Sequence, residues 1–442
     1  MRIQRSALRL VICAACLWLT CAMAQAQTDD SAPLSTAQPI TLEEALTRAV
    51  RQRPEMQGFL ADLDTARVQL DRAGAPPNPD LSVEVDNLGG GLPDDEVRET
   101  TISLSQPVEL GGKPTARRNK IMAATLRLRH EQTTAWLDIA AEVRTAFLEV
   151  LGSRERLALQ QEAEQIAAEL ARITRERVVA GELAATEETR AEARRAEAMV
   201  ETMQAKRLLA EAELDLATAL AAPDPLTAPA HDTLSPDIPV PDLPTLLATL
   251  QNSPYLALRR SETQLAASGL TLEQSNAWAD PALSLAIREI PDKDARAVAL
   301  GLSIPLPLFQ RNQTGIAEAG ATTRKAASNE EATNRRLRTE VTKAHSTLVA
   351  AGQEAHALRS EVIARAEEAS AAVQEGFRLG KFRYSDVLEA SQSLVVAKTR
   401  HLETVLDLNR AAIALDRLLG KPQPANEMHA TPSDTPADRS TP

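Results

Sequence analysis

Residues 78–83 read Asn-Pro-Asp-Leu-Ser-Val, and residues 280–285 read Asp-Pro-Ala-Leu-Ser-Leu, 202 positions later. Three other matches have nearly the same spacing, between 198 and 200 residues: Pro54 with Pro254, Pro107 with Pro305, and Gly181 with Gly380. Chance matches would not keep so constant an offset along the chain. The sequence therefore predicts a tandem duplication with a period of about 200 residues.

Apolar and polar residues alternate around the repeated phrase. In the first repeat the apolar positions are Leu81, Val83, Val85, Ile102 and Leu104, and in the second they are Leu283, Leu285, Ile287, Val298, Leu300, Leu302 and Ile304. Most of the residues between them are small or polar, and such a period of two predicts a pair of strands in each repeat.

Four strands cannot close a barrel, but three chains would supply twelve. In such a barrel we expect the larger apolar residues, for example Leu300 and Leu302, to face lipid, and Ala299 and Gly301 to face the lumen. The alternative is two hairpins that cap a soluble helical protein, although a lone hairpin is only marginally stable in water.

Each repeat also predicts four helices. The first two are short, at 41–52 and 54–73 and again at about 243–252 and 254–277, and the second begins with a proline at N1. After the strands, a long helix (115–179; 315–379) ends before Gly181 or Gly380, glycines suited to a left-handed C-cap. A second long helix (186–222; 385–420) returns, with Thr186 or Ser385 as the expected N-cap.

The long helices carry apolar residues at the spacing of a coiled coil. In the first repeat these are Trp136, Ala140, Val143, Phe147 and Val150, and in the second Leu337, Val341, Ala344, Leu348, Ala351, Ala355, Leu358 and Val362. Steps of three and four residues place them on one seam of each helix. We expect helical hairpins that are packed along this seam.

The repeats lie between segments of different composition. Residues 1–24 carry Arg2, Arg5 and Arg9, an apolar run and small residues, and are expected to be a cleaved secretory signal peptide. Repeats at 25–221 and 245–421 flank a proline-rich connector at 222–244, and 422–442 is expected to be a disordered tail. All three cysteines lie in the signal segment, so the mature chain has no thiol for disulfides or metal.

The composition excludes several functions. A net charge of −12 argues against a nucleic-acid partner. The six histidines show no ligand spacing, no Ser/His/Asp set has a motif around it, and Gly111-Gly112-Lys113 is a strand-to-helix turn rather than a P-loop. We expect no metal site, no cofactor and no enzymatic activity. Aromatic residues are only 2% of the chain, too few for the girdles of a self-contained barrel, so helix should dominate.

This arrangement resembles the TolC-like outer membrane factor family over essentially the whole mature chain. Three phrases resemble its CzcC-type heavy-metal efflux branch: Thr-Leu-Glu-Glu-Ala-Leu at 41–46, Gln-Pro-Val-Glu-Leu-Gly-Gly-Lys at 106–113 and Ile-Pro-Leu-Pro-Leu-Phe-Gln-Arg-Asn-Gln at 304–313. The resemblance implies a mainly α fold with long coiled-coil hairpins and two β-hairpins per chain. Three chains would form a homotrimeric twelve-stranded barrel and a twelve-helix periplasmic tunnel.

The resemblance also implies partners and a location. The barrel would contact outer-membrane lipid, and the helix–helix turns would meet a periplasmic adaptor (membrane fusion protein) coupled to an inner-membrane pump of the resistance–nodulation–division (RND) class. The residues expected to dock the adaptor are Gly181, Leu183, Gly380 and Phe382. The expected cargo is divalent cobalt, zinc or cadmium. The alternatives are a duct for drugs or type I protein secretion, and a periplasmic structural coiled coil without a pore.

Members of the family narrow the tunnel entrance with an acidic ring, and the matching residues here are Asp386 and Glu389. They lie three positions apart and so share a helix face. The alternative is that both are solvated acids that complement the helix dipole. Phe377 and Phe382 stand where TolC has a tyrosine and an arginine that help to lock the entrance, so a TolC-like latch is not expected.

Overall fold

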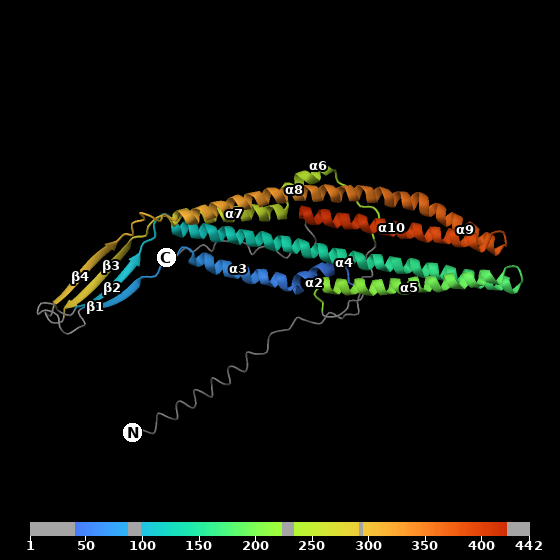
Figure 1. The fold of residues 1–442 in the computed structure, drawn as a ribbon, viewed down its shortest axis with the longest axis horizontal. Coiled ribbons are helices and arrows are strands. Elements are labelled where there is room, and N and C mark those ends of the chain that lie inside the picture. The colour runs from blue at the N-terminus through green and yellow to red at the C-terminus, as the bar shows by residue number, and fades with distance from the viewer. Residues whose placement is uncertain (1–39, 87–98, 223–233, 291–294, 422–442) are drawn as a thin grey trace, which may run out of the picture.

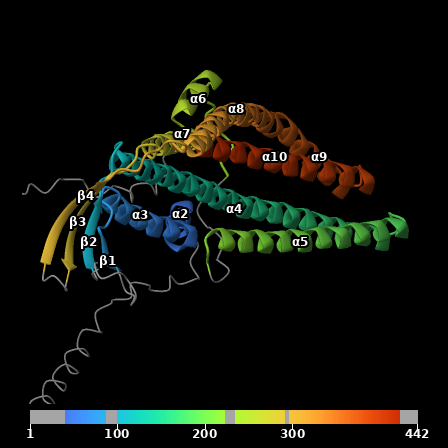
Figure 2. The same ribbon diagram turned by 60° about the vertical axis from the view of Figure 1, so that its left-hand side comes forward.

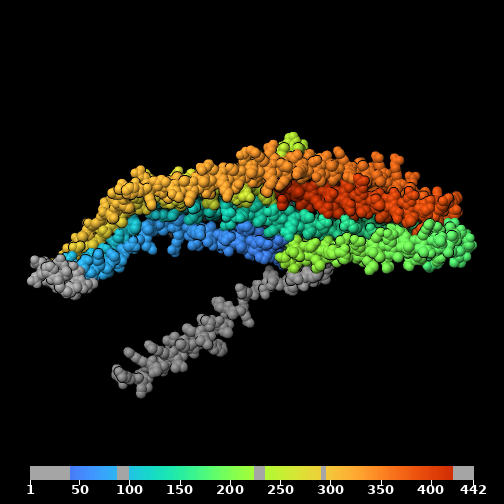
Figure 3. All heavy atoms as spheres, in the orientation of Figure 1, coloured from blue at the N-terminus to red at the C-terminus, as the bar shows by residue number. Residues whose placement is uncertain are grey.

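The computed structural model describes residues 40–86, 99–222, 234–290 and 295–421. They form a long, gently curved rod with a β-sheet at one end and two helix–helix turns at the other (Figures 1 and 3). The expected signal peptide and C-terminal tail lie outside the described residues, as does part of the connector. Among the described helices, none combines the length and the apolar character needed to cross a membrane.

The order of the elements confirms the tandem duplication and the mainly α fold. The first repeat contains α2 (Leu42–Gln52), α3 (Pro54–Arg72), β1 (Asp80–Asp86), β2 (Glu99–Pro107), α4 (Lys113–Val179) and α5 (Ala185–Ala219). The second contains α6 (Leu243–Thr249), the 3₁₀ helix η1 (Leu250–Asn252), α7 (Pro254–Ser275), β3 (Ala282–Ile290), β4 (Ala295–Ser303), α8 (Gln313–Ala357), the π-helix η3 (Leu358–Ile363), α9 (Ala364–Arg378) and α10 (Tyr384–Leu419).

The longest helix, α4, has 67 residues and so spans about 100 Å. Its partner within the repeat is divided into two pieces, α3 and α5, which lie end to end along it (Figure 1). The pieces are joined where the Arg53 guanidinium donates to the Ala219 carbonyl over 2.8 and 3.0 Å. In the second repeat the buried Ser253 hydroxyl donates to the Leu418 carbonyl over 2.7 Å. Each join satisfies a carbonyl that a helix end would leave unpaired.

The predicted coiled-coil seam is buried in the first repeat from Trp136 to Val150. In the second repeat the predicted seam is wrong at one position, because the Val362 side chain is 46% exposed instead of buried. Val362 lies within η3, where hydrogen bonds of the i→i+5 type widen the helical turn. The wider turn rotates Val362 away from the seam that Leu337 and Val341 begin.

The expected N-caps Thr186 and Ser385 were wrong. Helices α5 and α10 begin one residue earlier than expected, and their N-caps are Ala184 and Arg383. In α10 the cap contact comes from inside the helix, because the Arg383 backbone N–H donates to the Asp386 carboxylate over 2.9 Å. Thr186 and Ser385 therefore lie in the first turns of their helices.

The four strands form one antiparallel sheet in the order β1-β2-β3-β4. Apolar residues stand opposite one another in rows across all four strands: Leu81–Leu104–Leu285–Leu300 and Val83–Ile102–Ile287–Val298. The alternate positions carry rows such as Ser82–Ser103–Ala286–Ala299. One face of the sheet is therefore apolar, and its side chains in these rows are 46–86% exposed.

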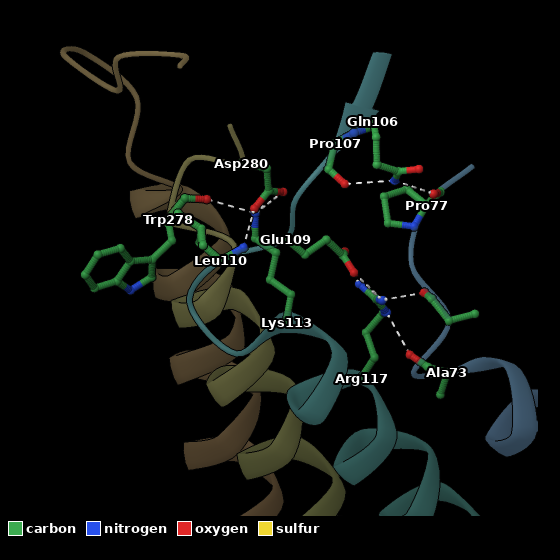
Figure 4. Close-up of polar contacts among 11 residues, drawn as sticks. Ala73, Pro77, Gln106, Pro107, Glu109, Leu110, Lys113, Arg117, Trp278 and Asp280 are labelled. Carbon is green, nitrogen blue, oxygen red and sulfur yellow. Dashed lines mark hydrogen bonds and ion pairs between the residues drawn. The ribbon is translucent and has the colours of Figure 1, made fainter. Parts of the chain in front are cut away.

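Partly buried ion pairs join the sheet to the helices (Figure 4). The Lys113 ammonium at the start of α4 contacts the Asp280 carboxylate at 2.5 Å and donates to the Trp278 carbonyl at 2.8 Å. Lys113 is 8% exposed, and both partners belong to the second repeat. Gly111 and Gly112 have φ values of +70° and +74°, which confirms the predicted strand-to-helix turn.

A second ion pair beside it holds the first repeat together. Arg117 donates to both carboxylate oxygens of Glu109 and to the Ala73 carbonyl at the end of α3. The hydrogen bonds from Arg117 lower the pKa of Glu109 below its ordinary value. Because the charges are paired and hydrogen-bonded, they fix the direction in which the sheet leaves the helices.

Candidate functional site at the helical tips

The hairpins α4–α5 and α9–α10 end at the same end of the rod, opposite the sheet (Figures 1 and 2). In both turns a glycine has left-handed backbone geometry, with φ of +78° at Gly181 and +73° at Gly380. The Glu182 N–H donates to the Arg177 carbonyl at 2.8 Å, and the Lys381 N–H donates to the Gly376 carbonyl at 2.7 Å. These are Schellman turns, and they confirm the predicted glycine C-caps.

A small apolar core lies directly behind the turns. Phe377 is fully buried, and its ring centroid lies 6.3 Å from that of the buried Tyr384. Burial raises the pKa of the Tyr384 phenol. Leu170, Ala171, Ala191 and Val387 also belong to this core, and Leu183 packs against it as a partly buried residue. Because α4, α9 and α10 all contribute, the core joins the two hairpins.

Arg177 ties one turn to the other. Its guanidinium lies 5.1 Å from the centroid of the Phe377 ring and donates to the Phe377 carbonyl at 3.2 Å. It also donates to the Glu182 carboxylate within its own turn at 3.0 Å. The side chain is only 18% exposed, so water weakens these contacts less than it would at the surface.

Arg177 was not among the residues predicted from the sequence to lie at the site. One feature of the sequence points to it. When the repeats are aligned at Gly181 and Gly380, Arg177 in the first repeat corresponds to Gly376 in the second. The ring of Phe382 covers Gly376, where a Cβ atom would collide with it. One repeat therefore has a bridging guanidinium where the other has room for an aromatic ring.

The residues expected to dock an adaptor lie at the surface to different degrees. Phe382 is 44% exposed, although part of its ring covers Gly376. Leu183 is partly buried in the tip core. The structure adds two apolar residues that flank the turns, Val179 at 83% exposure and Leu379 at 60%. Together these side chains give each tip an apolar surface outside the core.

The residues expected at the gate lie on the first turns of α10. Glu389 is exposed and Asp386 is partly buried, while Val387 between them points into the tip core. The Asp386 carboxylate also accepts a hydrogen bond from the Arg383 backbone N–H, so it caps the start of α10. Within the described ranges, no group of three or more His, Cys, Asp or Glu side chains could hold a metal ion.

Comparison with known proteins agrees with this architecture. The family described as outer membrane efflux protein matches residues 45–222 and 249–421, one block for each repeat. The cobalt-zinc-cadmium resistance protein CzcC of Cupriavidus metallidurans is 32% identical over 408 residues, which cover 90% of this chain and 96% of CzcC. The nickel and cobalt resistance protein CnrC of the same organism is 27% identical over 286 residues, 63% of this chain and 65% of CnrC.

Among solved structures, the outer membrane protein VceC of Vibrio cholerae has a TM-score of 0.72 at 20% identity, covering 86% of this chain and 96% of VceC. This likeness supports the fold, and the family match accounts for most of the sequence. The chain belongs to the outer membrane efflux protein family.

Proposed function

We propose that three copies of this chain form an outer-membrane channel that receives cargo from a pump in the inner membrane. The observation that carries the proposal is the sheet, whose exposed apolar face lies at the opposite end of the rod from the helical tips. An apolar face of this kind is unfavourable in water and suits contact with lipid. A periplasmic structural coiled coil has no need of such a sheet.

The proposed partners act at the tips. A periplasmic adaptor contacts the two turns of each chain, through their backbone and through Leu183, Phe382, Val179 and Leu379. The adaptor connects the channel to a pump of the RND class. Two observations support this arrangement: the tips carry apolar side chains outside their core, and α4 alone spans about 100 Å between the sheet end and the tips.

The proposed cargo is divalent heavy-metal cations, cobalt, zinc or cadmium. The support is the similarity to CzcC and CnrC, which are named for resistance to these metals and to nickel. The alternative is a duct for drugs or for secreted proteins. A channel of either kind need not bind its cargo, because the pump selects it.

The proposed gate consists of Asp386 and Glu389 from three chains. Six carboxylates close together would repel one another and attract cations. The exposure of Glu389 and the position of both residues beside the tip core support this role. Beside the proposed gate, the buried Phe377 and the contact from Arg177 to its carbonyl hold the two turns of one chain together.

Deletion of the gene tests the cargo. We expect the deletion strain to become sensitive to Co²⁺, Zn²⁺ or Cd²⁺ and to accumulate the metal, while its sensitivity to hydrophobic drugs stays unchanged. Expression of the full chain should restore resistance. Increased drug sensitivity with normal metal resistance would favour the alternative duct.

Arginine substitutions test which face of the sheet meets lipid. Leu300→Arg should impair membrane insertion, because an arginine facing lipid at mid-membrane costs about 2–4 kcal/mol. The matched Ala299→Arg places the same side chain on the opposite face and should insert normally. The amount of folded protein in outer-membrane fractions measures both variants. Normal insertion of Leu300→Arg with failure of Ala299→Arg would reverse the facing assignment.

Valine substitutions at the turn glycines test docking. Gly181→Val places the new side chain in open space, and Gly380→Val brings its Cβ to 3.7 Å from the Arg177 guanidinium, an ordinary contact. Both force a β-branched residue to positive φ, a strain of about 1–2 kcal/mol. We expect efflux and adaptor co-purification to fall while outer-membrane levels of the assembled protein stay normal. Gly58→Val in α3, where no neighbour lies within 4 Å, is the control. Loss of the assembled protein itself would assign the glycines to folding.

Neutralising the acids tests the gate. The double variant Asp386→Asn and Glu389→Gln should show reduced cation preference and weaker block by polyvalent cations in single-channel recordings. The amide oxygen introduced by Asp386→Asn can still accept the Arg383 N–H, so the start of α10 should persist, and circular dichroism would check this. Unchanged selectivity and block would leave the two residues as helix-start acids only.

A further inference from the structure

Strands β1 and β4 form the two edges of the sheet, each with a strand neighbour on one side only. An edge strand presents a row of backbone N–H and C=O groups that can pair with another strand. The apolar rows also run to both edges, ending at Leu81 and Val83 on β1 and at Leu300 and Val298 on β4. Both edge strands therefore carry apolar residues on this face, as the two inner strands do.

The duplication relates the strands by fixed offsets. Pro79 before β1 corresponds to Pro281 before β3, an offset of 202, and Pro107 corresponds to Pro305, an offset of 198. These offsets preserve register. Leu81 pairs with Leu104 in the first hairpin, and adding the offsets gives Leu283 with Leu302, the pair found in the second hairpin.

The β2–β3 contact joins the first repeat to the second and pairs Leu104 with Leu285 and Ile102 with Ile287. In a closed ring of identical chains, the second repeat of one chain meets the first repeat of the next. The same offsets carry the observed β2–β3 pairs onto that contact. Adding 198 to a β2 residue gives its counterpart in β4, and subtracting 202 from a β3 residue gives its counterpart in β1. The pair Leu104–Leu285 then corresponds to Leu302–Val83. The pair Ile102–Ile287 corresponds to Leu300–Val85.

We propose that β4 of one protomer pairs antiparallel with β1 of the next, in the register that places Leu302 opposite Val83 of the partner subunit. In the same register Leu300 lies opposite Val85 of the partner subunit, and Ile304 opposite Leu81 of the partner subunit. This inference rests on the proposed trimer and specifies how its subunits join.

The chemistry of both faces agrees with this register. On the apolar face every pair from Leu300 to Ile304 is aliphatic. On the other face Ser303 lies opposite Ser82 of the partner subunit, whose hydroxyl already lies 2.7 Å from that of Ser103 within its own chain. Gly301 lies opposite Glu84 of the partner subunit and leaves room for its side chain. A slip of one residue would instead move apolar side chains to the polar face.

Disulfide trapping tests the register. The mature chain is expected to contain no cysteine, so Val83→Cys with Leu302→Cys introduces the only thiols. Directly opposed residues have Cα atoms about 4.5–5.5 Å apart, within the disulfide range of about 4.4–6.8 Å. We expect mild oxidation of outer membranes to convert the double variant to a covalent trimer on non-reducing gels.

Three controls share its background. Val83→Cys with Leu300→Cys and Val83→Cys with Ile304→Cys shift one partner by two residues, to diagonal positions about 7–8 Å apart. These should give several-fold less trimer. Leu104→Cys with Leu285→Cys reproduces the contact inside one chain and should form a disulfide without linking chains.

Each outcome has one meaning. Efficient trimer formation by a shifted pair would overturn the proposed register. No interchain disulfide from any pair, in protein that amine cross-linking shows to be trimeric, would overturn pairing between β4 and β1. If amine cross-linking of the wild-type protein gives no trimer, the proposed assembly fails and the register fails with it.

Discussion

The apolar residues of all four strands face one side of the sheet, and in the rows that span the sheet each is at least 46% exposed. Water penalises such a surface, and the edges of β1 and β4 add backbone groups that can pair with other strands. Further strands would pair with the backbone groups at the edges, and lipid would cover the apolar face. In the proposed channel, copies of the chain complete this sheet, and the rod is oriented so that the helical tips point away from the membrane.

The helical part meets a different requirement, because α4 is too long for any one neighbour in its repeat to cover it. Helices α3 and α5 share that task, and the hydrogen bonds from Arg53 to the Ala219 carbonyl join them end to end. In the second repeat the Ser253 hydroxyl joins the start of α7 to the end of α10 in the same way. At one end, the pair between Lys113 and Asp280 connects the repeats where helices meet strands. At the other end, Arg177 and the Phe377 core connect them again. Contacts between the repeats thus occur at both ends of the rod.

Much of this fold could be predicted from the sequence, because it depends on periodic or duplicated features. The alternation around Leu283 predicts a strand, the spacing from Trp136 to Val150 predicts a coiled-coil seam, and Gly181 and Gly380 predict turns. What could not be predicted are contacts between residues far apart in sequence. Nothing in the surroundings of Arg177 indicates that it contacts Phe377, and nothing near Lys113 indicates Asp280. The exposure of Val362 depends on a π-helix that local periodicity does not reveal, and the roles of Asp386 and Glu389 depend on neighbouring chains.

In the proposed channel, three copies of the chain complete the sheet. The most direct measurement is native mass spectrometry of the full-length protein, purified from outer membranes in detergent and released intact in the gas phase. We expect one dominant species with the mass of three mature chains. A dominant single chain or dimer, from protein that retains its helical circular dichroism spectrum, would contradict it.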